Sequence, residues 1–274
     1  MALRVFITGG ASGLGRAFAQ RYAKDGARLL LGDIHAARMD ETVEALRALG
    51  AEADAISCDV RKEADLVAAA RWCEERWGGV DRVFNNAGVS AGGSIDAQSI
   101  SDWEWIVDIN LLGVARGCKA FVPLLKRQRS GRIVNTASMA GLTHPPQMAA
   151  YNATKAAVVS ISETMRTELA EHGIGVSVVC PSFVRTNLLD NFRGATPDVQ
   201  RTTTRLLTKA KQTPDEVASL VHRGVERGEF LILTDRGSRQ AYLAKRWLPG
   251  SVFAGIVEKR AKRAMEQRPE TPDA

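Results

Sequence analysis

Short apolar segments rich in β-branched residues alternate along the chain with longer segments of helical periodicity. The apolar segments predict seven strands, at Arg4–Thr8, Arg28–Gly32, Glu52–Ser57, Arg82–Asn85, Arg132–Thr136, Gly175–Cys180 and Phe230–Thr234. Several of these segments are hydrophobic almost throughout, as is typical of parallel strands covered by helices on both faces. The pattern therefore predicts one α/β domain of the Rossmann type, with a doubly wound, seven-stranded parallel sheet.

The segments between the strands predict helices at Leu14–Lys24, Ala36–Leu49, Glu63–Trp77 and Asp102–Lys126. The clearest helix is expected at Tyr151–His172, which is rich in alanine and contains neither glycine nor proline. Gly173 follows at the position where a helix C-terminus favours a left-handed residue.

The region after the sixth predicted strand has a different character. Asn187–Gln212 is mostly polar and predicts a long connection, which is usually functional or mobile. About 40 residues then follow the last strand. We therefore divide the chain into a dinucleotide-binding and catalytic region, residues 1–236, and a helical, basic C-terminal extension of the same domain, residues 237–274.

Composition supports a folded enzyme-sized domain rather than a disordered chain. The 274 residues are 45% hydrophobic and 25% charged, close to globular averages. The four cysteines, Cys58, Cys73, Cys118 and Cys180, are widely separated, so they predict buried thiols and no metal site. The apolar stretch at the N-terminus is too short for a signal peptide, and no segment of about 18 apolar residues follows. These features predict a cytoplasmic protein.

The first predicted strand runs into a glycine-rich turn, Thr8–Gly15, that opens a helix. Glycines there let the backbone approach a pyrophosphate, whose charge is attracted by the free N–H groups of the helix N-terminus. The alternative is an ordinary tight strand-to-helix connection. Asp33 lies about 20 residues further on, at the end of the second strand, where a carboxylate can accept hydrogen bonds from ribose hydroxyls. It would also repel a 2′-phosphate, so we expect NAD in preference to NADP, although the nearby Arg38 favours the opposite; the other role open to Asp33 is a helix N-cap.

Tyr151 and Lys155 are four residues apart, and therefore lie on one face of the predicted helix. A free tyrosine has a pKa of about 10. A tyrosine that moves a proton near neutral pH needs a nearby positive charge and hydrogen bonds to its phenolate. The spacing predicts that Lys155 supplies this charge and lowers the pKa of Tyr151.

These motifs together resemble the short-chain dehydrogenase/reductase family. Its members carry TGxxxGxG, NNAG, a serine after a strand, and YxxxK in this order, and the chain has all four over most of its length, at Thr8–Gly15, Asn85–Gly88, Ser138 and Tyr151 with Lys155. The resemblance implies hydride transfer between nicotinamide and an alcohol or carbonyl group. A cofactor-bound scaffold protein of the same fold is the alternative, against which the intact Ser138, Tyr151 and Lys155 argue.

The resemblance also implies roles for individual residues. Ser138 would hydrogen-bond the substrate oxygen, although a loop serine bonded to backbone is an open alternative. Asn110 would hold a water in the proton relay, and Lys155 would bind the nicotinamide ribose. The residues expected to bind the cofactor are Gly9, Ser12, Gly13, Leu14, Gly15, Asp33, Asp59, Val60, Asn86, Ala87, Gly88, Tyr151, Lys155, Pro181, Val184 and Thr186.

One position departs from the family pattern. The family has Pro-Gly after the sixth strand, followed by a threonine that binds the carboxamide, whereas this chain has Ser182 after Pro181. A serine enters positive φ less easily than glycine does, so the local backbone shape is expected to be affected.

The substrate is expected to contact loops beyond the carboxyl ends of the strands. The expected pocket walls are Ser90, Met139, Leu142, Met148, Phe183, Leu188, Leu189 and Phe192. They are mostly apolar and contain no Arg/Lys fork, so we expect a hydrophobic secondary alcohol or ketone.

The net charge is +6, and part of the excess lies in the C-terminal extension. From Arg236 to Arg268 the sequence has nine basic residues but only two acidic ones. We prefer an extension that caps the substrate pocket or packs on a partner subunit over one that docks on an anionic membrane surface. Nucleic-acid binding is not expected, since there is no recognition motif and no interleaved stacking aromatics. A homodimer or homotetramer is expected by resemblance.

Overall fold

The computed structural model describes residues 2–186, 192–194, 201, 204–205, 208 and 210–266. Its centre is a seven-stranded sheet in the order β3-β2-β1-β4-β5-β6-β7, in which every neighbouring pair is parallel. The strands are β1 (Arg4–Thr8), β2 (Arg28–Asp33), β3 (Glu52–Ser57), β4 (Arg82–Asn85), β5 (Gly131–Thr136), β6 (Ile174–Cys180) and β7 (Leu231–Leu233). The predicted Rossmann-type fold is confirmed, and each predicted strand is present within two residues of its expected ends.

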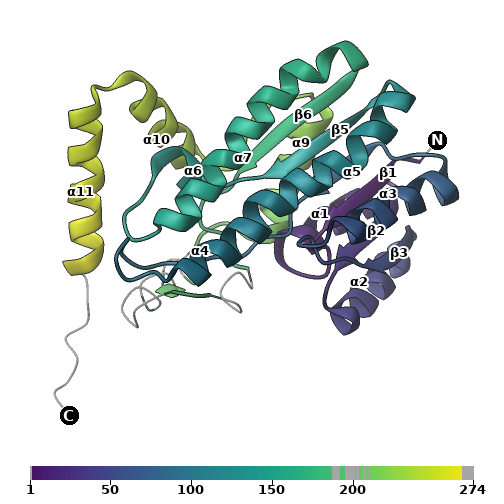
Figure 1. Ribbon diagram of the computed structural model, residues 1–274, viewed down its shortest axis with the longest axis horizontal. Helices are drawn as coiled ribbons and strands as arrows, with labels where there is room; N and C mark the ends of the chain where they lie inside the picture. The colour runs from purple at the N-terminus through teal and green to yellow at the C-terminus, as the bar shows by residue number, and fades with distance from the viewer. Residues whose placement is uncertain are drawn as a thin grey trace.

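Helices cover both faces of the sheet, with α5 and α7 in front of it and α9 behind it in Figure 1. The helical elements are α1 (Gly13–Ala23), α2 (Ala36–Ala48), α3 (Glu63–Trp77), α4 (Ile100–Val107), η1 (Asp108–Leu112), α5 (Gly113–Gln128), α6 (Ala140–Thr143), α7 (Ala149–Glu168), η2 (Ala170–His172), α9 (Pro214–Glu226), α10 (Arg236–Trp247) and α11 (Gly250–Glu266). None of the helices in the described part of the chain is both long and apolar enough to cross a membrane.

Alternation along each strand separates the core into two layers. Phe6 and Val83 face a layer that includes side chains of α3, α5 and α7, such as Phe121. Ile7 and Phe84, their chain neighbours, face a second layer built with α1, α2 and α9. Because side chains alternate across a strand, covering both faces requires the continuous hydrophobic runs seen in the sequence.

Two predicted helices differ from the observed ones. The helix expected at Asp102–Lys126 is interrupted by η1, one π-helical turn, which separates α4 from α5. The helix expected at Tyr151–His172 begins two residues earlier, at Ala149, and its last turn tightens into the 3₁₀ segment η2. Gly173 then has φ of 70°, so it ends this region in the left-handed conformation that was predicted.

The other regions singled out in the sequence are placed as follows. All four cysteines are buried and free. Most of the long connection Asn187–Gln212 lies outside the described residues. The C-terminal extension forms α10 and α11, which follow the last strand.

Candidate active site

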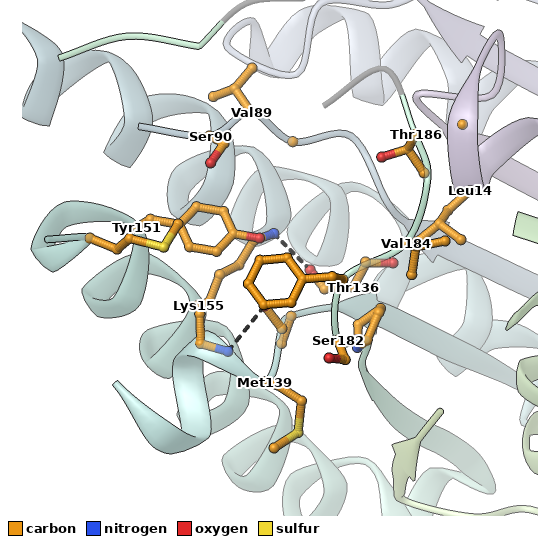
Figure 2. Close-up of a pocket in the computed structure, with 18 of the residues that line it drawn as sticks. Leu14, Val89, Ser90, Thr136, Met139, Tyr151, Lys155, Ser182, Val184 and Thr186 are labelled. Atoms are coloured by element: carbon orange, nitrogen blue, oxygen red, sulfur yellow. Dashed lines mark hydrogen bonds between the residues drawn. The ribbon is translucent and has the colours of Figure 1, made fainter. Parts of the chain in front are cut away.

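The carboxyl ends of β1, β2, β4, β5 and β6 open into one cavity with a volume of ≈ 1170 Å³. Pockets for a single small ligand are usually about 300–1,000 Å³, so this cavity has room for more than one bound group. It extends from the glycine-rich turn to Tyr151, and Figure 2 shows Leu14 and Thr186 on one side of it and Tyr151 and Met139 on the other. The fold thus brings both candidate motifs into one space.

The glycine-rich turn needs glycine at its last position. A Cβ on Gly15 would collide with the carbonyl oxygen of Gly9 and would lie 2.7 Å from the side-chain amide nitrogen of Asn86. Gly9 and Gly13 have φ of 64° and 52°, in the left-handed region that favours glycine. Gly15 does not itself line the cavity, and it packs against Gly9 and Asn86 instead. Ser12 does line it and is the N-cap of α1, and its hydroxyl makes no capping bond.

Asp33 is buried beside this turn, with 8% of its surface exposed. Its carboxylate accepts hydrogen bonds from the backbone N–H of Ala11 at 3.1 Å and from those of Ile34 and His35 at 2.8 and 3.1 Å. The N-cap of α2 is His35, so the alternative role of Asp33 as the cap of that helix is wrong. Asp33 instead braces the turn while it lines the cavity.

Two further groups expected at the cofactor also line the cavity. Asn86 donates a 2.9 Å backbone hydrogen bond to the hydroxyl of Thr8, and its side-chain amide donates to the carbonyl oxygens of Thr8 and Gly9. This ties the NNAG segment to the end of β1. Asp59 forms a 2.6 Å ion pair with Arg61, whose hydrogen bond holds the pKa of that carboxyl below its usual value. Val60, Ala87 and Gly88 line the same region.

Tyr151 and Lys155 lie on one face of α7 and point into the cavity (Figure 2). Both are buried, with 7% and 4% of their surface exposed. The ammonium nitrogen of Lys155 lies 5.8 Å from the centroid of the Tyr151 ring, and it donates a 3.0 Å hydrogen bond to the carbonyl oxygen of Thr136 at the end of β5. This hydrogen bond therefore fixes the side chain of Lys155, which α7 carries, to the sheet.

Burial controls the titration of both groups. It raises the pKa of the Tyr151 phenol, against a hydrogen bond with Ser138 that lowers it. It lowers the pKa of Lys155 to about 8. The pKa of Tyr151 is therefore raised overall, because desolvation of the phenol is the larger effect and Ser138 is the group that opposes it. The expected effect of Lys155 on this pKa stays a prediction.

Ser138 follows β5 and lines the cavity next to Tyr151. Its hydroxyl oxygen accepts a 3.1 Å hydrogen bond from the backbone N–H of Ala140, the first residue of α6. The local backbone bond that was its alternative role is therefore present together with the bond to Tyr151.

Asn110 lies in η1 and is completely buried. Its side chain pairs with the backbone of Val89, because Oδ1 accepts from the N–H at 2.8 Å and Nδ2 donates to the carbonyl at 2.9 Å. A Cβ on Gly88 would lie 3.2 Å from Asn110 Oδ1 and 3.4 Å from Lys155 Nζ, so these two side chains meet at Gly88. Asn110 does not line the cavity, and the π-helical turn explains how an asparagine is accommodated within a helical segment.

The segment after β6 closes the cavity near the glycine-rich turn. Pro181, Val184 and Thr186 line it, and a Cβ on Gly13 would lie 3.4 Å from the Thr186 side chain. Ser182 is not among the non-glycine residues with positive φ in the described chain. Serine is therefore accommodated at this position without a left-handed backbone.

A family model for short chain dehydrogenases matches residues 4–196, which is most of the chain and includes the candidate site. The chain belongs to the short-chain dehydrogenase/reductase family. Among its relatives, the oxidoreductase SadH of Mycobacterium tuberculosis is 34% identical over 255 residues, which cover 92% of each chain. The CLA biosynthesis dehydrogenase/reductase of Lactiplantibacillus plantarum is 32% identical over 249 residues, which cover 84% of this chain and 87% of that protein.

Solved structures of the family agree with this assignment. A short-chain dehydrogenase/reductase from Burkholderia phymatum, determined in complex with NAD, has 35% identity and a TM-score of 0.82, and the match covers 100% of this chain and 98% of that one. Levodione reductase has 28% identity and a TM-score of 0.79, with 88% of this chain and 98% of that one covered.

The substrate end of this short-chain dehydrogenase differs in part from the predicted pocket walls. Ser90, Met139, Met148, Phe183 and Phe192 line the cavity as expected. Leu142 does not, because it faces a neighbouring cavity beneath α10. Leu188 and Leu189 lie outside the described residues.

The extension lines this end of the cavity, in agreement with the preferred expectation that it caps the substrate pocket; its lining residues are Gln240, Ala241, Ala244, Phe253, Ile256 and Val257. Thr143, Pro145, Pro146, Gln147 and Arg193 come from the loops beyond the carboxyl ends of the strands, where the substrate was expected, and Trp105 of α4 was not anticipated. The guanidinium of Arg193 lies 4.3 Å from the centroid of the Trp105 ring, so the pocket wall does contain a cation. The sequence shows the paired prolines and the apolar positions of the basic extension. Which of these side chains reach the cavity depends on the tertiary fold.

Proposed function

We propose that this chain is an NAD-dependent dehydrogenase/reductase that transfers hydride between nicotinamide and a hydrophobic secondary alcohol or its ketone. The observation that carries the proposal is the single cavity, which joins the glycine-rich turn and Asp33 to Ser138, Tyr151 and Lys155. The NAD-bound relative from Burkholderia phymatum supports the same cofactor.

The residues present fit a dinucleotide. The turn offers the N-terminus of α1 and the uncommitted Ser12 hydroxyl to a pyrophosphate, and Asp33 offers a carboxylate to a ribose. We assign cofactor binding to Gly9, Ser12, Gly13, Leu14, Asp33, Asp59, Val60, Asn86, Ala87, Gly88, Tyr151, Lys155, Pro181, Val184 and Thr186, with Gly15 shaping the turn. The nicotinamide supplies the hydride acceptor or donor when it is bound.

The proton is moved by the chain's own residues. In ketone reduction the Tyr151 hydroxyl donates its proton to the carbonyl oxygen, and in alcohol oxidation the phenolate accepts one. Ser138 donates a hydrogen bond to the same oxygen and stabilises the negative charge that develops there. The ammonium of Lys155 favours the phenolate when the proton leaves, and its remaining N–H groups are available to a ribose hydroxyl.

Asn110 acts through its neighbours. Its side chain is committed to Val89 and meets Lys155 beside Gly88, so we assign it a positioning role at this wall of the site. A water held near the lysine would be bound by the backbone of η1, where a π-helical turn displaces carbonyl groups from the regular pattern.

The C-terminal extension belongs to the same domain. Residues 1–236 contain the sheet and the proposed catalytic groups, while α10, which begins at Arg236 and continues into residues 237–274, packs on α6 and β7. The boundary between residues 236 and 237 therefore divides two parts of the proposed active site and does not divide two folding units.

The test is oxidation of secondary alcohols and reduction of ketones, followed by the absorbance of NADH. We expect NADH to form from NAD⁺ with a hydrophobic secondary alcohol, and the rate with NADP⁺ to be lower. If no alcohol or ketone in a broad panel is converted with either cofactor while NADH still binds, the chain is a cofactor-bound scaffold instead.

A further inference from the structure

The last helix, α11, stands at the edge of the molecule and is joined to the body through α10 (Figure 1). Most of its described side chains are exposed to solvent. Helix stability in proteins comes mainly from burying an apolar face. The large apolar residues of this exposed helix therefore call for an explanation.

The apolar face of α11 points to the active-site cavity. Phe253, Ile256 and Val257 all line it, and their spacing of i, i+3 and i+4 places them on one side of the helix. Ile256 is 37% exposed and the other two are half-buried. Val252, which does not line the cavity, is 49% exposed. The cavity that holds Tyr151 thus has an apolar outer wall that is incompletely covered.

The wall is held to the catalytic segment by α10. The Lys245 ammonium donates to the carbonyl oxygen of Leu142 at 2.5 Å and to His144 Nδ1 at 2.9 Å. His144 Nε2 lies 3.1 Å from the carbonyl oxygen of Gly141, so the tautomer with a proton on Nε2 satisfies both ring nitrogens. These residues are in and directly after α6, which begins two residues after Ser138. The extension is therefore fixed to the segment that carries a proposed catalytic residue.

The other walls of this end of the cavity include the apolar side chains of Trp105, Met148, Pro146 and Phe183. Polar groups also line it, namely Gln147, Gln240 and Arg193, whose guanidinium stacks on the Trp105 ring. Asp235, which also lines the cavity, is engaged by the N–H and hydroxyl of Ser238 at the start of α10. An apolar cavity wall binds apolar groups best, because contact removes both surfaces from water.

We propose that α11 is the distal wall of the substrate site, and that it selects alcohols and ketones with a long apolar substituent remote from the reacting carbon. This inference rests on the proposed function and names its substrate class. The occupant of the apolar face of α11 is the substrate itself, because Phe253, Ile256 and Val257 share one continuous cavity with Tyr151.

The test compares the binding of 2-butanone, 2-octanone and 2-dodecanone to the full-length protein with NAD⁺ present, measured by calorimetry. The variants are Phe253→Ala and Ile256→Ala, with Val252→Ala as a matched control one turn before Ile256. Each added methylene that is buried contributes about 0.8 kcal/mol, which is about fourfold in Kd. We expect the wild type to bind 2-dodecanone at least about tenfold more tightly than 2-butanone.

The two pocket-side variants should weaken binding of 2-dodecanone about three- to tenfold, while Val252→Ala should leave it unchanged. Equal binding of the three ketones by the wild type, or equal effects of all three variants, would overturn the role of α11. If Ile256→Ala instead changes the oligomeric state or vesicle binding without changing ketone binding, the apolar face serves a second copy or a membrane. Turnover of short alcohols without any preference for chain length would refute this inference and leave the proposed function standing, whereas absence of all turnover would refute the proposed function.

Discussion

The ammonium of Lys155 donates a 3.0 Å hydrogen bond to the carbonyl oxygen of Thr136. This bond fixes the lysine of α7 to the carboxyl end of β5, two residues before Ser138. Burial lowers the pKa of Lys155 to about 8, so the site holds a charged group at a cost to folding. Such a cost is typical of residues retained for function rather than for stability.

Lys155→Met should reveal this cost through its dependence on pH. Below pH 8 the wild type keeps a buried ammonium, whereas between pH 8 and the ordinary lysine pKa of 10.5 the native state loses that proton before the unfolded chain does. The melting temperature of the variant relative to the wild type should therefore be highest below pH 8 and should fall as the pH rises toward 10.5. Thermal unfolding of both proteins at pH 7 and at higher pH measures this difference, and a difference that grows with pH would contradict it. The ionisation of Cys58, Cys73 and Cys118 is common to both proteins and cancels, whereas Cys180 is coupled to Lys155, whose charge lowers the pKa of that thiol.

Ser138→Ala should change both the rate and its pH dependence. Removing one preorganised donor to the developing oxyanion typically lowers kcat about a hundredfold. The hydrogen bond of Ser138 lowers the pKa of Tyr151, so its loss should move the rising limb of alcohol oxidation to higher pH. Ser90→Ala, which also alters a cavity hydroxyl, is the control, because Ser90 is not among the groups that shift this pKa. If the rising limb of the pH profile for alcohol oxidation were unchanged in Ser138→Ala, Ser138 would have no part in the proton transfer.

Gly15→Ala should disrupt the glycine-rich turn, because the added Cβ would collide with the carbonyl oxygen of Gly9. We expect the Kd for NADH to rise at least about tenfold, equivalent to about 1.4 kcal/mol, and the melting temperature to fall. Gly250→Ala is the matched control, since a Cβ there meets no atom within 4 Å. Fluorescence titration with NADH and thermal unfolding measure the two effects; tight NADH binding by Gly15→Ala would show that this turn does not hold the pyrophosphate.

Asp33→Ala should weaken NAD binding by about tenfold, the loss expected for hydrogen bonds to a charged group, and should weaken NADP binding less. The substitution also removes the brace between Asp33 and Ala11, so some loss with both cofactors is expected. The Kd values for NADH and NADPH, measured for both proteins, give the preference. A wild-type preference for NADP would show that Arg38, and not Asp33, controls the choice of cofactor.

Much of the architecture could be predicted because the sheet is buried on both faces. In β2, for example, the apolar run Leu29–Leu31 is completely buried, and the short length of such runs distinguishes strands from helices. The motifs predicted many of the groups that line the cavity because each motif follows a parallel strand, and all parallel strands present their carboxyl ends at one edge of the sheet.

The differences arise where tertiary contacts override the local sequence. The π-helical turn at Asn110 forms around the bonds of that side chain to Val89, which is distant in sequence. The raised pKa of Tyr151 comes from burial, which the spacing to Lys155 cannot reveal. The approach of α11 to the cavity depends on the attachment of Lys245 to Leu142, over a hundred residues away.

The central claim is that Tyr151 transfers the proton that accompanies hydride transfer, and Tyr151→Phe tests it most directly. The substitution removes only the hydroxyl and keeps the buried ring. For oxidation of a secondary alcohol accepted by the wild type, with NAD⁺ saturating, we expect kcat to fall about a hundredfold to ten-thousandfold while the Kd for NADH changes little. Retention of most of the wild-type kcat by a variant that binds NADH normally would contradict the account.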